Sequence, residues 1–256
     1  MFAISPIPAF QDNYIWALHN EAGHCVVVDP GDAAPVERFL DAHSLNLGAI
    51  LITHHHPDHT GGIAALSSNH EVVVYGPANP AISGITQPLR NGDELTLDAF
   101  DLHLKVLEVP GHTLDHIAFY SAQKHILFCG DTLFHCGCGR LFEGSPEQML
   151  QSLDRLAELP GETAVYCTHE YTLANMRFAQ AVEPDNATLA AALDAVQALR
   201  NQDQPSLPTH IDVQRQINPF LRSRELSVIQ AIRAREPSAS SPAEIFASLR
   251  TWKDRF

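Results

Sequence analysis

The sequence predicts an α/β protein with mixed sheets, followed by a helical C-terminal region. Through about the first 170 residues, short apolar runs bounded by Gly, Pro, Asn and Asp alternate with single amphipathic helices. Several neighbouring runs form hairpins, which favours mixed sheets over a continuous series of parallel β-α-β units. After about residue 172 the strand pattern almost disappears. We therefore expect two domains, residues 1–172 and residues 173–256.

The first half of the chain shows this alternation most clearly. Residues 14–19 and 24–29 flank the turn Asn20–Gly23 and are predicted to form a hairpin, because Asn and Gly favour tight turns. The further elements expected here are a helix over 35–44, a buried strand over 49–52, a helix over 62–69, and strands over 72–75 and 101–109.

The second half begins with a hairpin and ends in helices. The pattern predicts strands over 117–120 and 125–129, a helix over 146–159 and a strand over 164–168. Helices then follow over 173–182, 188–201, 225–235 and 242–256, separated by segments that contain proline.

Composition and charge exclude some classes of function. The chain has 256 residues, 16 Lys and Arg against 30 Asp and Glu, and a formal net charge of −14. A general nucleic-acid or acidic-membrane binder needs clustered basic residues, so neither is expected. Residues 205–256 nevertheless carry eight basic against five acidic residues. Composition alone favours a chance fluctuation or a solvated helical surface as the explanation.

The sequence gives no sign of a membrane or of secretion. No uninterrupted apolar run approaches the roughly 18 residues that cross a bilayer, and the first basic residue is Arg38. The five cysteines are an odd number scattered along the chain, which fits a reducing compartment. We expect a cytoplasmic monomer.

Four potential metal ligands lie within the six residues 54–59, just after the strand at 49–52. They are His54, His56, Asp58 and His59. Side chains at i and i+2 of extended backbone point to the same side, so the first two histidines can converge on one ion. The other two ligands can reach a second point nearby. Imidazole and carboxylate are ligands that zinc and similar divalent metals take.

Three later strand ends each deliver a residue of the same kind. His112, Asp131 and His169 each come shortly after one of the expected strands. Surface polarity explains a single histidine in a loop, but it does not explain ligand types at four strand ends. The sequence therefore predicts a metal centre.

The pattern His54-x-His56-x-Asp58-His59, with the three later ligands in this order, resembles the metallo-β-lactamase superfamily. The resemblance implies a four-layer αββα sandwich that holds two divalent metal ions at the edge of its sheets, zinc first, with iron or manganese as alternatives. One ion would take His54, His56 and His112. The other would take Asp58, His59 and His169, and Asp131 would bridge both.

Further motifs narrow the resemblance to the glyoxalase II family of hydroxyacylglutathione hydrolases. They are Gly130-Asp131-Thr132-Leu133-Phe134, Gly137-Cys138-Gly139-Arg140, Thr168-His169-Glu170-Tyr171-Thr172 and Arg250-x-x-Lys253-Asp254-x-Phe256. The similarity extends to the last residue and includes the helical tail. It implies hydrolysis of S-D-lactoylglutathione to D-lactate and glutathione, the second step of methylglyoxal detoxification.

The resemblance also implies roles for single residues. Asp58 would orient the attacking hydroxide as well as serve as a ligand, and Asp131 would bridge the ions. The residues expected to bind the glutathione moiety are Arg140, Phe142, Tyr171, Arg250 and Lys253. Some members of the family have Tyr where this chain has Phe142, so a hydroxyl contact would be absent there.

Two other classes of function remain open at this stage. Iron-dependent glutathione persulfide dioxygenases and diiron redox proteins use a related scaffold, and the ligands alone do not exclude them. The motif Arg250-x-x-Lys253 favours the hydrolase. A non-catalytic metal-binding module is disfavoured, because a substrate clamp accompanies a complete set of ligands.

Several residues near the ligands keep two interpretations. Cys136 and Cys138 could be read as thiolate ligands or as a nucleophile. We favour the interpretation that they are small buried or loop cysteines. Asp29 and His116 either support ligating histidines or serve local turns. His55 is expected to point away from the metals.

Overall fold

The computed structural model describes residues 1–256 and divides into two compact units. Unit 1 comprises Met1–Glu108 and Asp115–Gly130, and unit 2 comprises Val109–Leu114 and Asp131–Phe256. No helix in either unit combines the length and the apolar character that a membrane span requires. The expected domain division at residue 172 stays a prediction.

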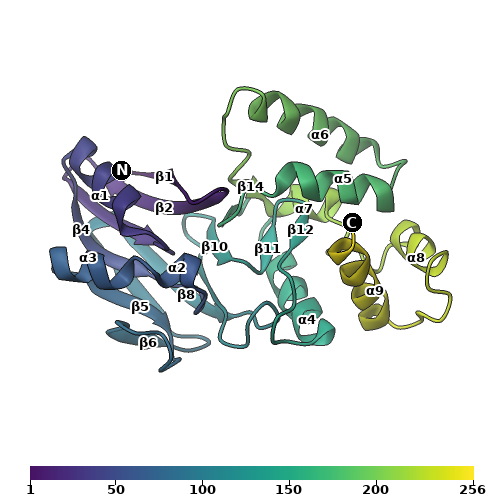
Figure 1. Ribbon diagram of the computed structural model, residues 1–256, viewed down its shortest axis with the longest axis horizontal. Helices are drawn as coiled ribbons and strands as arrows, with labels where there is room; N and C mark the ends of the chain where they lie inside the picture. The colour runs from purple at the N-terminus through teal and green to yellow at the C-terminus, as the bar shows by residue number, and fades with distance from the viewer. The chain divides into compact units, whose positions relative to one another are not determined.

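Unit 1 contains a six-stranded mixed sheet in the order β1-β2-β3-β4-β5-β6 (Figure 1). The strands are β1 (Phe2–Ala9), β2 (Asn13–Asn20), β3 (His24–Val28), β4 (Asn46–Leu51), β5 (Val73–Pro77) and β6 (Gln87–Leu89). The predicted hairpin is confirmed, since β2 and β3 pair antiparallel. The edge strand β1 was not predicted. Its Pro6 and Pro8 obscure the strand pattern and are tolerated only because one side of β1 is unpaired.

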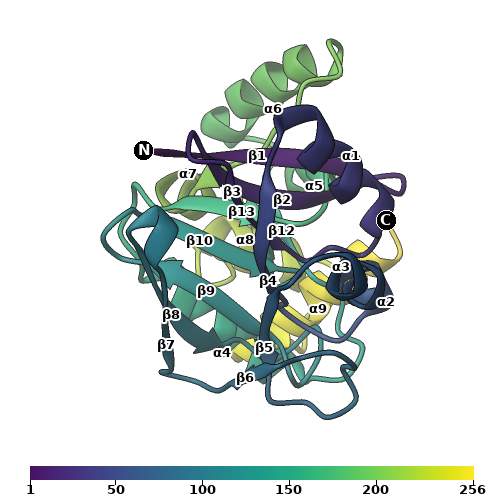
Figure 2. The ribbon, with the colours of Figure 1, turned by 90° about the vertical axis from the view of Figure 1, so that its left-hand side faces the viewer.

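Three helices follow the strands of this sheet and share one of its faces (Figure 2). They are α1 (Ala33–His43), α2 (Pro57–Thr60) and α3 (Ile63–Asn69). Leu40 of α1 and Leu66 of α3 belong to one apolar cluster with Ile15, Val27 and Ile50 of the sheet. Burial of this face fixes the end of β4, from which the histidine-rich loop leaves.

The opposite face of the sheet is covered by a second, antiparallel sheet of unit 1. Its strands are β7 (Glu94–Leu97), β8 (Leu102–Glu108), β9 (Ile117–Ser121) and β10 (Ile126–Gly130), paired in sequence order. Trp16 and Leu18 of β2 point to this face and are buried. The predicted hairpin of 117–120 with 125–129 is confirmed as β9 and β10.

Unit 2 is mainly helical (Figure 1). Its helices are α4 (Pro146–Ala157), α5 (Thr172–Val182), α6 (Ala187–Arg200), α7 (Ile211–Ile217), α8 (Leu226–Arg233) and α9 (Pro242–Asp254). Its short strands are β11 (Leu133–Phe134), β12 (Gly137–Cys138), β13 (Ala164–Cys167) and β14 (Thr209–His210). The expected helices of this region are present, whereas the sequence pattern did not indicate α7, β11, β12 or β14.

Two of these helices begin with capping boxes that the sequence encodes. Ser145 caps α4 with Gln148, and Ser241 caps α9 with Glu244; each pair satisfies backbone N–H groups reciprocally. The last helix packs through Trp252, whose ring meets Phe178 edge-on at 5.3 Å. The C-terminal motif is thereby held on a defined helix.

Candidate metal centre

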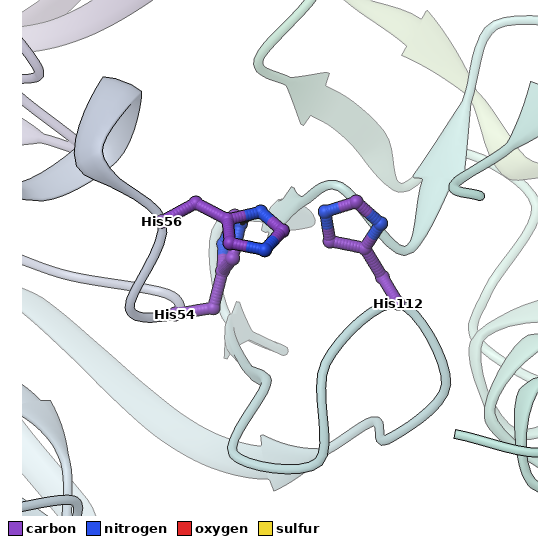
Figure 3. A group of neighbouring side chains, drawn as sticks. All are labelled: His54, His56 and His112. Atoms are coloured by element: carbon purple, nitrogen blue, oxygen red, sulfur yellow. Dashed lines mark hydrogen bonds between the residues drawn. The ribbon is translucent and has the colours of Figure 1, made fainter. Parts of the chain in front are cut away.

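The first group of candidate ligands lies in unit 1, on the loop that leaves β4. His54 and His56 point toward one another, as Figure 3 shows, with Nε2 of His54 3.1 Å from Nδ1 of His56. The convergence expected from their i and i+2 spacing is therefore present. His54 is fully buried, and its Nδ1 lies 3.0 Å from the Thr53 hydroxyl, so the ring is held in one orientation.

Asp29 supports this loop from the end of β3. Its carboxylate accepts hydrogen bonds from the backbone N–H of Thr53 at 2.8 Å and from the Thr53 hydroxyl at 2.7 Å. The same carboxylate lies 3.0 Å from Nδ1 of His59. A carboxylate can only accept, so His59 carries its proton on Nδ1 and leaves the lone pair of Nε2 for a metal ion. The structure thus gives Asp29 a role in orienting a ligand.

Asp58 lies in the first turn of α2. Its Oδ2 accepts a hydrogen bond from the side-chain amide of Asn13 at 3.0 Å and lies 3.4 Å from Nε2 of His59. Its side chain is 40% exposed, whereas His59 is fully buried. A carboxylate and an imidazole nitrogen therefore meet at one point of unit 1.

The neighbouring histidines are placed differently. Nδ1 of His55 lies 2.9 Å from the Asp115 carboxylate, which also accepts a hydrogen bond from Asn79 at 2.8 Å. His116 stacks on the ring of His54, with centroids 4.6 Å apart and planes at 15°. His55 is thus directed toward Asp115, and His116 supports a candidate ligand by packing.

The second group of candidate ligands lies in unit 2. A single oxygen of Asp131, Oδ2, is 3.4 Å from Nε2 of His112 and 3.3 Å from Nε2 of His169. All three side chains are buried. His112, also drawn in Figure 3, comes from the loop that follows β8. One carboxylate placed between two imidazoles has the arrangement that a bridging ligand needs.

Both histidines of unit 2 are oriented by neighbouring groups. Nδ1 of His112 lies 2.7 Å from the backbone carbonyl oxygen of Arg140, which leaves Nε2 to face Asp131. The ring of His169 stacks on Tyr171, with centroids 4.6 Å apart and planes at 4°. The ring of Phe142 meets His112 edge-on at 5.3 Å. Two of the predicted substrate-binding residues thus contact candidate ligands directly.

The remaining predicted substrate-binding residues form a cationic cluster around Asp254. Nη2 and Nε of Arg250 donate to Oδ1 of Asp254 at 2.9 and 3.1 Å, and Nη1 donates to the carbonyl of Cys138 at 2.9 Å. Nε of Arg140 lies 3.4 Å from the same carboxylate oxygen. The Arg250 side chain is 8% exposed and that of Arg140 is 60% exposed. Only Arg140 presents its guanidinium broadly to solvent.

Lys253 of the same cluster is half-buried. Its Nζ donates to the carbonyl of Ala174 at 3.2 Å and lies over the ring of Phe178. Burial, and next the charge of Arg250, lower the pKa of its ammonium group from the ordinary value. Asp254 was not singled out from the sequence, although it lies within the terminal motif.

The cysteines near the site are packing residues. Cys136 and Cys138 are buried, and burial raises the pKa of the Cys138 thiol to about 11 and that of Cys136 still further. The Cys136 thiol donates to the backbone carbonyl of Ile217 at 3.2 Å. A protonated, buried thiol is a poor nucleophile and a poor ligand, so the structure favours the packing interpretation.

The side chains that could hold a metal ion fit the donor set of a divalent metal. They are His54, His56, Asp58 and His59 in unit 1, and His112, Asp131 and His169 in unit 2. Imidazole nitrogens and carboxylate oxygens suit zinc, iron and manganese alike. Their orientation by backbone and carboxylate partners is typical of metal sites.

Comparisons with known proteins decide the family. The model of the metallo-β-lactamase superfamily matches residues 10–169, and that of the hydroxyacylglutathione hydrolase C-terminus matches residues 170–256. A hydroxyacylglutathione hydrolase of Cupriavidus taiwanensis is 58% identical and is covered over 100% of both chains. The chain belongs to the hydroxyacylglutathione hydrolase family. The predicted resemblance is confirmed.

Solved structures agree on the fold of this family member. ETHE1 from Myxococcus xanthus is 25% identical with a TM-score of 0.66, over 99% of this chain and 98% of that one. The di-iron-bound form of TTHA1623 is 25% identical with a TM-score of 0.60, over 84% and 99%. The chain has the αββα metallo-β-lactamase fold, as predicted, and its superfamily and donor set imply a divalent metal-binding enzyme.

Proposed function

We propose that this chain is a thioester hydrolase that converts S-D-lactoylglutathione and water to D-lactate and glutathione. The observation that carries the proposal is the 58% identity, over the whole of both chains, to a protein named hydroxyacylglutathione hydrolase. The match of the family's C-terminal model to residues 170–256 supports it, because that region contains the cationic cluster. The proposed cluster residues are Arg140, Arg250 and Lys253, with Tyr171 and Phe142 beside them.

We further propose that two divalent ions bind to the seven candidate ligands. One would be held by His54, His56 and His112, and the other by Asp58, His59 and His169, with Asp131 bridging them. The ions would supply an acidified water as nucleophile and positive charge for the carbonyl oxygen. Zinc, iron and manganese all fit these donors, and zinc is our first choice.

The protein's own residues bind and orient the substrate. The exposed guanidinium of Arg140 is the first cation that a glutathione carboxylate meets, and Arg can hold a carboxylate through two parallel hydrogen bonds. Arg250 holds Asp254 and β12 in place, and thereby fixes the position of Arg140. Phe142 and Tyr171 offer exposed rings against which the tripeptide can pack.

The reaction needs no dedicated proton donor. The water oxygen forms a bond to the thioester carbon, the C–S bond breaks, and the electron pair leaves on sulfur. Of the two water protons, one ends on the glutathione sulfur and the other passes to solvent, which leaves D-lactate as a carboxylate. A free thiol has a pKa of about 8.5, so a thiolate leaves readily near neutral pH. Asp58, held by Asn13, is the carboxylate that we propose orients the attacking oxygen.

The direct test supplies purified, zinc-loaded protein with S-D-lactoylglutathione and follows the loss of thioester absorbance. We expect turnover, and in Arg140→Ala we expect KM to rise about tenfold, an effect that added salt reduces because surface charges are screened. Oxygen consumption with glutathione persulfide, without thioester hydrolysis, would replace the proposal with the dioxygenase alternative. No turnover with zinc, iron or manganese in folded protein would refute it.

We also propose that the protein acts as a monomer in the cytoplasm. All five cysteines are free and buried, which fits a reducing compartment. Size-exclusion chromatography with light scattering tests the oligomeric state, and a mass twice that of the chain would refute the monomer.

A further inference from the structure

Asn13 stands where the hairpin of β1 and β2 meets the ligand loop. It begins β2 and pairs with Ala9, the last residue of β1. Its side chain is not used in the turn between them. Asn13 is only 5% exposed, and its side-chain amide donates a hydrogen bond to Oδ2 of Asp58 at 3.0 Å, 45 positions further along the chain. Burial of an amide without a hydrogen-bond partner costs free energy, so the hydrogen bond to Asp58 offsets the cost of burying Asn13.

The backbone of Asp58 is held from another direction. A Cβ atom on Gly31 would lie 1.9 Å from the carbonyl oxygen of Asp58, so only glycine lets the loop after β3 approach so closely. The N–H of Gly62 donates to the carbonyl of Pro30 at 2.8 Å and closes the same contact. The main chain of Asp58 is therefore fixed, and the direction of its partly exposed carboxylate depends on rotation about its side-chain bonds. The hydrogen bond from Asn13 opposes this rotation.

We propose that Asn13 is a positioning residue of the metal site. Its amide holds Oδ2 of Asp58, the oxygen that also lies 3.4 Å from Nε2 of His59, and so keeps the carboxylate turned toward this candidate ligand. The proposal rests on the proposed function, because it takes Asp58 as a ligand. Asn13 contacts no substrate. It acts on the ion only through Asp58.

The chemistry of the donor supports this role. An amide N–H is neutral, so it orients the carboxylate without cancelling its charge. Lysine or arginine in the same place would bind Asp58 through a charge-assisted bond and compete with the metal ion. Aspartate would repel it at 3 Å. Asparagine therefore fits the requirement for a fixed but still anionic ligand.

The test compares metal binding by Asn13→Ala and a matched control, Asn20→Ala. Asn20 ends the same strand, and its side-chain amide donates to the carbonyl of Ala99 at 2.7 Å, far along the strand from the ligand loop. Each zinc-loaded protein is equilibrated with a graded chelator, and the zinc retained per chain is measured. In Asn13→Ala we expect the affinity for one of the two ions to fall about 10- to 100-fold. Asn20→Ala should retain both ions as the parent does.

Two further measurements separate positioning from general damage. The visible spectrum of the cobalt-loaded protein should change in Asn13→Ala and not in Asn20→Ala, because the geometry around one ion alters. In an Asp58→Ala background, Asn13→Ala should change zinc affinity less than twofold, because its route to the ion is gone. Asn13→Ser, which is polar and smaller, repeats the test if the alanine variant does not fold.

The outcomes distinguish this inference from the proposed reaction. Unchanged zinc affinity and an unchanged cobalt spectrum in Asn13→Ala would overturn the positioning role, as would an equal loss with and without Asp58. A parent protein that binds two ions but hydrolyses no glutathione thioester refutes the reaction alone. A parent that binds fewer than two ions refutes the proposed two-ion site and, with it, this inference.

Discussion

Replacing Asp29 with Asn tests whether a hydrogen-bond partner decides which nitrogen of His59 can bind a metal. Asp29 is 2% exposed and faces Nδ1 of His59 at 3.0 Å and the N–H and hydroxyl of Thr53. Asn has nearly the same shape, but with its oxygen toward the Thr53 N–H, its NH₂ group faces His59. Nδ1 must then accept, the proton moves to Nε2, and the lone pair for the metal is lost.

The expected size of this effect follows from the general behaviour of ligating histidines. Loss of the partner that orients a ligating histidine typically lowers metal affinity about 10- to 100-fold, or about 1.4–2.7 kcal/mol. We expect Asp29→Asn to release zinc to a chelator at a correspondingly lower chelator concentration, measured as zinc retained per chain.

The matched control is Asp32→Asn in the same loop. Asp32 accepts from the N–H of Ala34 at 3.0 Å as the N-cap of α1, a position at which Asn is equally favourable. This variant carries the same change of charge and should bind zinc as the parent does. The reasoning about His59 is refuted if Asp29→Asn retains zinc with the affinity of the parent and the control.

Two further predictions concern stability and thiol reactivity. Hydrogen bonds from Ser241 and Ser240 lower the pKa of Glu244 to about 2, so its stabilisation of α9 should be lost as pH falls from about 4.5 to 2. Glu244→Gln keeps the capping box without the charge. In urea unfolding between pH 2 and 5, the stability of this variant should depend less on pH than that of the parent. Burial raises the pKa of Cys25 and Cys167 to about 12, so the native chain should take up no iodoacetamide at pH 8, whereas the urea-unfolded chain should take up five equivalents; rapid modification of the folded protein would contradict the burial.

Local sequence patterns predicted the elements that depend on local interactions. Both hairpins have turn residues and alternation within about 16 positions, and the helices after residue 172 repeat apolar residues with helical spacing. The strand β1 was missed because its two prolines are tolerated only at a sheet edge, and edge position is a property of the tertiary fold. The two-residue strand β14 pairs with β13 across 44 and 46 positions and has no local signal of its own.

The candidate site likewise has one part that local sequence predicts, the ligands, and one part that it does not, their supporting partners. Ligand types at strand ends are visible in the sequence, because their spacing and chemistry are local properties. Their supporting partners are not. Asn13 reaches Asp58 and Asp115 reaches His55 across 45 and 60 positions, and nothing about a single Asn or Asp indicates such a pairing. Asp254 lies beside Lys253 in a recognised motif, but only the structure shows that two arginines share its carboxylate.

Several basic residues in the C-terminal region have specific structural partners, which composition alone did not indicate. Arg222 pairs with Glu183, Arg224 with Asp154, and Arg235 lies over Trp252.

The charge that excluded a nucleic-acid binder does not exclude a small anion. At physiological ionic strength, exposed charges more than about 8 Å away are largely screened, so a small ligand responds to its immediate surroundings and not to the net −14 of the chain. Arg140 and Arg250 both lie within 3.4 Å of Oδ1 of Asp254, so two guanidinium groups meet one carboxylate. The local excess of positive charge fits the small anionic substrate that we propose. It is too small for a polyanion that must contact many cations at once.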